Sequence, residues 1–139
     1  MSLPELDNLV RIGKLKEEAP SQIEIDGLIR SGKVRLEDAQ NKTNSLEGRF
    51  DLAYNAAHAL SLAALRWHGY RPENRYVVFQ VLPHTLGIDT AVWRTLAKCH
   101  QRRNVAEYEG HLEVDEQLSS DLVICAEHVY AEVSKLGPD

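Results

Sequence analysis

The sequence predicts an all-α fold, an up-and-down bundle of five to six helices that forms one domain over residues 1–139. Apolar side chains recur every three or four residues over 46–67 and again over 118–133, which is the period of one helix face. Glycine and proline stand at intervals that suit helix ends. These two observations favour helices over strands along most of the chain.

The first half of the chain contains three predicted helices. Residues 3–12 form a short amphipathic helix that ends at Gly13. A second helix begins after Ser21, which has the spacing of a capping box with Glu24. We expect Gly32 to interrupt this helix before residues 34–40 continue it. The third helix, 46–67, is rich in alanine, so a neighbouring helix can approach it closely.

The second half begins with a predicted loop at residues 69–74. Residues 75–82 have strand-forming side chains, but without a second strand to pair with them we expect a short helix that Pro83 ends or kinks. Asp89 or Thr90 then caps a helix over 91–108, which Gly110 terminates. Asp115 caps a last helix that extends to Leu136.

Composition limits the function classes. The net charge of −5 means that a nucleic-acid or membrane binder would need a local basic patch. The longest uncharged stretch, 52–65, is too short to cross a bilayer, so we expect no membrane association. Cys99 and Cys125 fit core positions of helices rather than a disulfide framework. With no signal peptide at the amino end, these features favour a cytoplasmic protein.

The sequence suggests no metal and no cofactor. The six histidines show neither an HExxH motif nor the Cys/His spacing of a zinc finger. We expect His58 and His128 to be core or boundary residues. There is also no glycine-rich phosphate loop.

The helix over 91–108 contains an arginine where its periodicity requires an apolar residue. Its core stripe is Val92, Leu96, Cys99, Arg103 and Ala106. An arginine on such a stripe is costly unless it is paired or lines a groove. Two interpretations stay open: a structural pair of Arg103 with Glu107, or an anion-binding Arg103 in a cleft.

The same helix contains a second basic feature. Arg94, Lys98 and Arg102 follow one another at four-residue spacing, and no acidic residue lies between Thr90 and Ala106. A solvated face is the commoner explanation of such a run. A phosphate backbone or an acidic partner would also make the arrangement useful, because like charges at this spacing destabilise a helix.

Three segments together resemble the HEPN family of helical domains. Residues 45–57, Ser-Leu-Glu-Gly-Arg-Phe-Asp-Leu-Ala-Tyr-Asn-Ala-Ala, resemble the long second core helix of that family, and Gly69-Tyr70-Arg71 resembles the loop after it. Residues 102–108, Arg-Arg-Asn-Val-Ala-Glu-Tyr, resemble the family signature of an arginine, a polar residue, a few variable residues and a histidine.

The resemblance implies a bundle that usually forms homodimers, with signature arginines and histidines meeting at the interface. Many HEPN proteins are metal-independent ribonucleases, often in toxin–antitoxin or defence systems, and others are partners of minimal nucleotidyltransferases. Residue by residue, Arg103 takes the arginine position and Asn104 the polar one. Tyr108 stands where the histidine is expected, and His111 is a possible substitute beyond Gly110.

This departure weakens the case for catalysis. A histidine, with a pKa of about 6.5, accepts a proton near neutral pH, whereas a tyrosine, with a pKa of about 10, is a poor base. We therefore expect a HEPN-like module that binds RNA, or a nucleotidyltransferase-type partner, with weak or no catalysis. The alternatives are a metal-independent endoribonuclease that uses Arg103, Asn104 and Tyr108 or His111, and an interaction bundle unrelated to nucleic acids.

Overall fold

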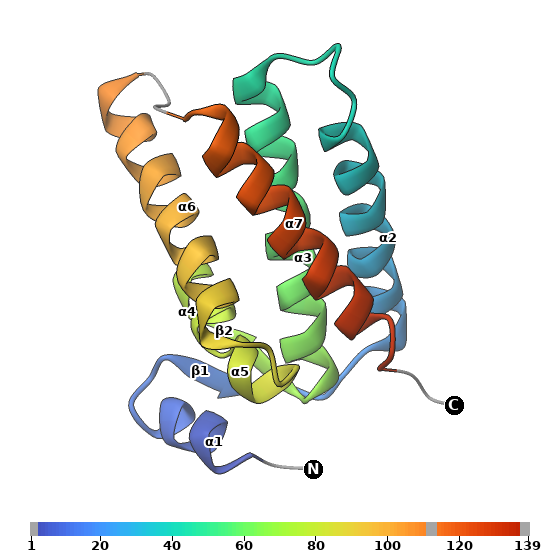
Figure 1. The fold of residues 1–139 in the computed structure, drawn as a ribbon. Helices are drawn as coiled ribbons and strands as arrows, with labels where there is room; N and C mark the ends of the chain where they lie inside the picture. Colours follow the sequence, from blue (N-terminus) through green and yellow to red (C-terminus); the bar gives the residue numbers. More distant parts are fainter. Residues whose placement is uncertain (1–2, 111–113, 137–139) are drawn as a thin grey trace.

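A computed structural model describes residues 3–110 and 114–136 and confirms the all-α bundle (Figure 1). Four long helices run alternately up and down: α2 (Gln22–Ala39), α3 (Leu46–Trp67), α6 (Thr90–Glu109) and α7 (Glu116–Val133). The shorter elements are α1 (Pro4–Arg11), β1 (Leu15–Glu17), β2 (Tyr70–Pro72), α4 (Arg75–Gln80) and α5 (Leu82–Thr85). The described residues form seven helices, whereas the sequence predicts five to six. The additional helix is α5, which follows the predicted helix α4 as a separate short element.

Side-chain caps fix where the long helices begin. Ser21 Oγ accepts from the backbone N–H of Glu24, and Asp115 Oδ1 accepts from that of Leu118. Asp89 Oδ1 accepts from the N–H of Ala91. These caps are the ones that the sequence predicts. Helix α7, however, ends at Val133 rather than Leu136.

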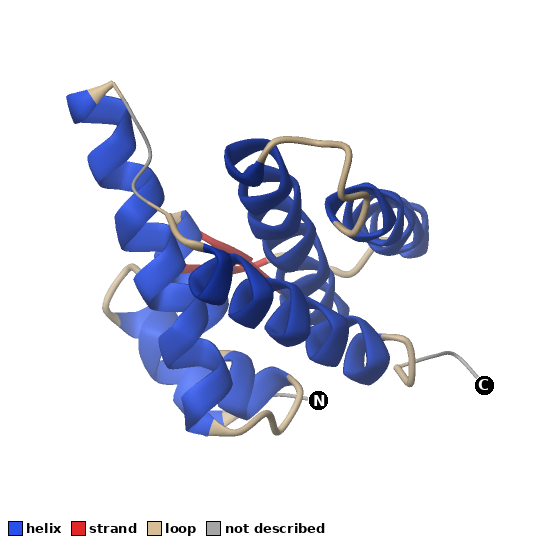
Figure 2. Ribbon diagram, turned by 45° about the horizontal axis from the view of Figure 1, so that its top comes forward, coloured by secondary structure: helices blue, strands red, loops and turns tan. Residues whose placement is uncertain are grey.

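Helix α3 is the centre of the core. It packs against α2 on one side and α7 on the other, and α6 lies beside α7 (Figure 2). Its large buried side chains include Phe50, Tyr54 and Leu60. The alanines between them are also buried, which lets the neighbouring helices approach closely, as expected.

The expected interruption at Gly32 is wrong. Helix α2 continues through this residue, and Gly32 is buried against α3. A Cβ atom at this position would lie 2.5 Å from Leu60 Cγ. The glycine therefore allows close contact between two helices instead of ending one.

The predicted loop at 69–74 contains a short strand. β2 pairs antiparallel with β1, so that Leu15 lies opposite Pro72 and Glu17 opposite Tyr70. A second, smaller hydrophobic cluster forms around this pair and includes Leu6, Leu15, Leu65, Tyr70, Val77 and Val81. It joins α1, the strands and α4 to the carboxyl end of α3.

A buried arginine links these segments. Arg66, at the end of α3, is 1% exposed. Its guanidinium donates to the carbonyl oxygens of Glu18, Ala19 and Tyr70, at 3.0, 2.8 and 3.2 Å. Its Nε donates to Glu24 Oε1 at 2.8 Å. The Glu24 side chain is therefore directed toward α3, although the sequence suggests a reciprocal capping box with Ser21.

Arg71 completes this network from the strand. It binds Glu18 Oε2 through Nε and Nη2, at 2.9 and 2.6 Å, and also reaches Glu24 Oε2 at 3.0 Å. The hydrogen bond from Arg71 lowers the pKa of Glu18, and the hydrogen bond from Arg66 lowers the pKa of Glu24. Both carboxylates are thus held in the charged form.

We expect Gly32→Ala to lower the free energy of unfolding by about 1–3 kcal/mol, because the new methyl group overpacks the contact with Leu60. Gly27→Ala is the matched control, since the same helix has open space there and the alanine should stabilise by up to about 1 kcal/mol. Chemical denaturation of both variants measures the difference. Equal effects of the two substitutions would contradict the close contact at Gly32.

We expect stability to fall in acid. A carboxyl group whose pKa is lower in the folded protein stabilises the fold above its ordinary pKa of 4.5, and this contribution is lost as the pH falls through the lowered value. Thermal unfolding between about pH 7 and pH 3 should show a loss below about pH 4.5 that Glu24→Gln reduces. Glu73→Gln, at an exposed carboxylate, should leave the loss as steep as in the parent.

Candidate functional site

The amino-terminal two thirds of α6 direct one face into the core and leave Arg103 at its edge. Leu96 and Cys99 are fully buried, and Arg103 follows them on the same stripe with 27% of its side chain exposed. This is the position that the periodicity predicts. Arg103 lies at the rim of the core, where it faces α3.

Arg103 has two contacts with α3. Its Nε lies 3.1 Å from Asp51 Oδ1, and its guanidinium carbon lies 4.9 Å from the centre of the Tyr54 ring. Asp51 is 54% exposed, so this ion pair is at the surface. The side chain of Glu107, the partner that the sequence suggests, lies outside the described part of the structure. Asp51 is a partner that the sequence analysis did not identify.

A histidine lies one helical turn before Asn104. The Tyr54 hydroxyl is 2.8 Å from His100 Nδ1, and the Asn104 amide nitrogen is 3.1 Å from His100 Nε2. When the amide donates to Nε2, the ring proton is on Nδ1 and is donated to the tyrosine oxygen. Two hydrogen bonds therefore orient the imidazole beside Arg103.

This histidine is the functional candidate that the sequence analysis missed. His100 lies three residues before Arg103 and four before Asn104, so the three side chains are neighbours on the surface of α6. This spacing could have identified His100 from the sequence. Arg103 and Asn104, which the HEPN resemblance singles out, are thus found together. The side chain of Tyr108 and all of His111 lie outside the described residues.

Two adjacent grooves lie along the contact between α4 and α6. The arginine groove has a volume of about 590 Å³ and is lined by Asn74, Arg75, Tyr76, His100, Arg103 and Asn104. The aromatic groove, of about 490 Å³, shares Tyr76, His100 and Asn104 with it and adds Trp93, Arg94, Ala97, Lys98 and Gln101. Within the described chain, neither groove is lined by an acidic side chain.

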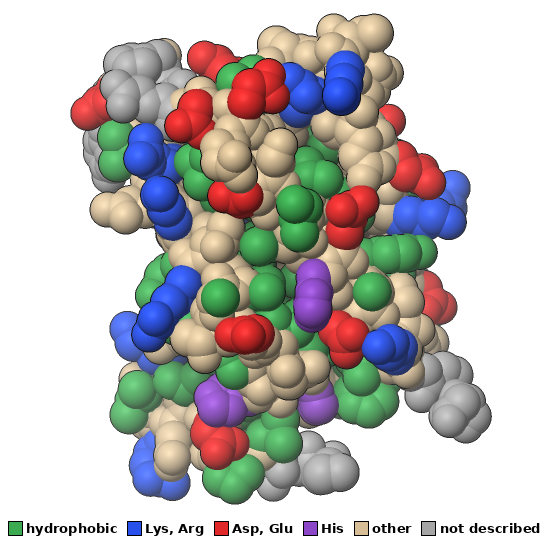
Figure 3. Space-filling view, viewed as in Figure 1, with side chains coloured by type: hydrophobic (Ala, Val, Ile, Leu, Met, Phe, Trp, Pro, Cys, Tyr) green, Lys and Arg blue, Asp and Glu red, His purple; other side chains and the backbone are tan. Residues whose placement is uncertain are grey.

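The predicted basic run divides between two surfaces. Arg94 and Lys98 line the aromatic groove, whereas Arg102 faces a third groove between α6 and α7 together with Lys98. Asp115 and Asp121 line that third groove. Figure 3 shows Lys and Arg side chains along α6 and acidic side chains toward the end where α7 begins. Arg102 is therefore in a mixed environment, Arg94 is in a basic one, and Lys98 lies between the two and lines both grooves.

The charge around the arginine groove also affects His58 on α3. Burial, together with the nearby positive charges of Arg75, His100 and Arg103, lowers the pKa of His58 to about 4. His58 is thus neutral at pH 7, in the boundary position expected for it. His128, by contrast, is exposed on α7.

The described residues give little support for a cysteine nucleophile, a metal site or a membrane-spanning helix. Burial raises the pKa of the Cys99 thiol to about 12, so Cys99 is a poor nucleophile. No cluster of His, Cys, Asp or Glu side chains in the described ranges is arranged to hold a metal ion. None of the helices described is long and apolar enough to span a bilayer.

No family model matches the chain, and a comparison with curated proteins found no significant match. The site must therefore be interpreted from its own geometry.

We expect Arg103→Ala to cost about 1–2 kcal/mol of stability, because a surface ion pair and an exposed cation–π contact each contribute up to about 1 kcal/mol. Leu96→Ala, at a fully buried position of the same stripe, should cost about 2–5 kcal/mol through a cavity. Thermal unfolding of both variants tests this order. A loss in Arg103→Ala as large as that in Leu96→Ala would mean that the arginine is mainly structural.

Proposed function

We propose that this chain is a HEPN-like RNA-binding module whose arginine and aromatic grooves bind the phosphate backbone. The observation that carries the proposal is the charge of the two grooves: Arg75, Arg94, Lys98 and Arg103 line them, and no acidic side chain among the described residues does so. The rest of the surface has excess negative charge, since the whole chain carries −5.

Three of the four cations are available for a ligand. Arg75, Arg94 and Lys98 are exposed and form no ion pair with any side chain that the structure describes. Cations on a polyanion-binding surface release condensed counterions when they bind phosphates, and this release drives association. A local patch of this kind is sufficient on an acidic protein, because the Debye length is about 8 Å at physiological salt.

The resemblance to HEPN domains supports the choice of RNA. It places Arg103 and Asn104 in the signature, and these residues line the arginine groove. By the same resemblance we propose that the protein acts as a homodimer, in a toxin–antitoxin or defence system, with a nucleotidyltransferase-type protein as a possible partner. Val105, an exposed apolar residue on α6, is compatible with a second copy packing there.

His100 favours RNA cleavage as a second candidate function. In metal-independent cleavage a base removes the proton from the 2′-hydroxyl, the resulting oxygen attacks phosphorus, and an acid protonates the 5′-oxygen as it leaves. An imidazole can act as this base or acid because it can both accept and donate a proton. Arg103 would stabilise the negative charge on the phosphorane, and Tyr54 would orient the ring.

Labelled single-stranded RNA tests both candidates. We expect binding that weakens with salt, and Arg94→Gln/Lys98→Gln should lower the slope of log affinity against log salt by about 1.4, from two lost phosphate contacts. Arg30→Gln/Lys33→Gln, which removes the same charge from exposed positions of α2, is the matched control.

Denaturing gels of the same samples report cleavage, which His100→Ala should abolish if the histidine is catalytic. Sedimentation equilibrium of the parent protein at tens of micromolar reports the proposed dimer. Equal salt slopes in the two double variants would contradict the proposed interface.

A further inference from the structure

We infer that Tyr76 and Trp93 form a subsite for an unpaired nucleobase, so that the interface recognises single-stranded nucleic acid rather than a duplex. This inference rests on the proposed function and specifies which nucleic acid the grooves accept.

Tyr76 is exposed although the residues after it are buried. Its side chain is 39% exposed, whereas Val77, Val78 and Phe79 point into the core. The Tyr76 ring therefore lies outside the buried core of α4, at the surface between α4 and α6. Its exposed part is accessible to a ligand.

Trp93 meets this ring from α6. The two ring centroids are 6.4 Å apart and the planes are nearly perpendicular, at 81°. The His100 ring also contacts Tyr76, with the ring centroids 5.9 Å apart. Contacts with two rings hold Tyr76 in place, so little conformational entropy would be lost when a planar ligand stacks on it.

The rings lie between two pairs of cations. Tyr76 is the one residue of α4 that lines both grooves. Arg75 and Arg103 line the arginine groove. Arg94 and Lys98 line the aromatic groove. A matching ligand has a flat aromatic group between two negative charges. An unpaired base with a phosphate on each side has this form.

Other anionic ligands match less of the surface. In a duplex the faces of the bases are covered by their neighbours, so an aromatic side chain cannot stack on them without unstacking the helix. An acidic peptide or inorganic polyphosphate would use the cations and leave both rings without a function. The alternation of aromatic and basic side chains is the pattern of single-strand binders.

The experiment compares four probes: a single-stranded RNA, a single-stranded DNA of the same sequence, the RNA duplex and inorganic tripolyphosphate. Tyr76→Leu should weaken binding of the single strands by about tenfold, and Tyr76→Phe should retain it, because phenylalanine keeps the stacking surface. Tripolyphosphate binding should be unchanged in both variants. Circular dichroism melting of Tyr76→Leu establishes that it is folded.

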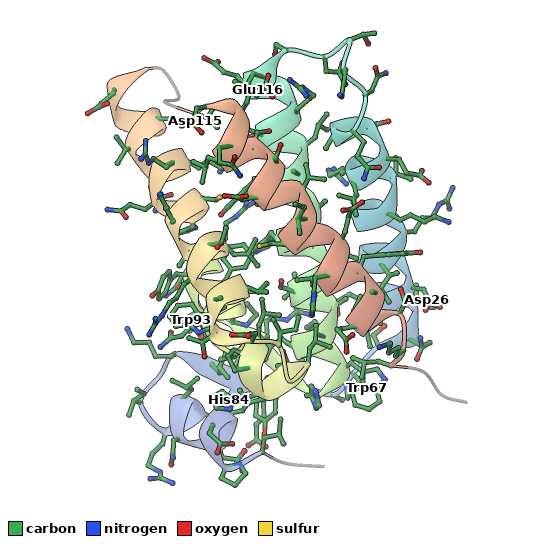
Figure 4. All side chains as sticks on the ribbon, in the orientation of Figure 1. Asp26, Trp67, His84, Trp93, Asp115 and Glu116 are labelled. Carbon is green, nitrogen blue, oxygen red and sulfur yellow. The ribbon has the colours of Figure 1, made fainter. Side chains whose placement is uncertain are left out.

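Tryptophan fluorescence gives a second readout in a protein with Tyr76 intact. The sequence has two tryptophans, and Figure 4 shows Trp67 on α3, well apart from Trp93 on α6. In Trp67→Phe, emission comes from Trp93 alone. Single-stranded RNA should quench this emission, and tripolyphosphate should not.

The outcomes separate the two proposals. Preference for single strands, loss in Tyr76→Leu and quenching of Trp93 would support the base subsite, and a difference between RNA and DNA would then report a contact with the 2′-hydroxyl. Equal affinity for duplex and single strands, with Tyr76→Leu unchanged, would overturn the subsite and leave the phosphate-binding function intact. No binding of any nucleic acid would overturn the proposed function, and this inference with it.

Discussion

The buried guanidinium of Arg66 is the interaction on which the rest of the architecture depends. It joins the end of α3 to the carbonyl groups of Glu18 and Ala19 before α2 and to Tyr70 in β2. β2 leads directly into α4, which positions Arg75 and Tyr76 opposite α6. An apolar residue in place of Arg66 would leave these carbonyl groups without a donor, so the cost would extend beyond one ion pair. The structural arginine thus positions one wall of both grooves.

Much of the fold could be predicted from local patterns, and the exceptions have a common cause. Period and caps identify the long helices because both depend on neighbouring residues. The strand Tyr70–Pro72 was missed because three residues carry no periodic signal, and its partner Leu15–Glu17 lies more than fifty residues earlier. Gly32 was misinterpreted because its role depends on Leu60 of another helix. Sequence patterns indicate the local conformation that a residue favours. They do not indicate which residues of other elements contact it.

The same distinction applies to the candidate site. The position of Arg103 at the edge of the core followed from the helical period. Its contacts with Asp51 and Tyr54 did not, because they come from α3. The run of Arg94, Lys98 and Arg102 was treated as one face, but eight residues rotate a helix by about 80° beyond two full turns. This rotation directs Arg102 toward α7 and its acidic side chains, away from the groove that Arg94 lines.

The contacts of Arg66 also divide the molecule into parts of different local stability. Helix α3 can form with α2 and α7 from interactions that involve only the long helices, but the segment before α2 has its binding groups on the far end of α3. The carbonyl of Glu18 accepts from a guanidinium forty-eight residues along the chain, so the segment before α2 is held to the bundle through the far end of α3. We expect this segment to open before the long helices, and amide hydrogens of α1 to exchange with solvent ahead of those in α3.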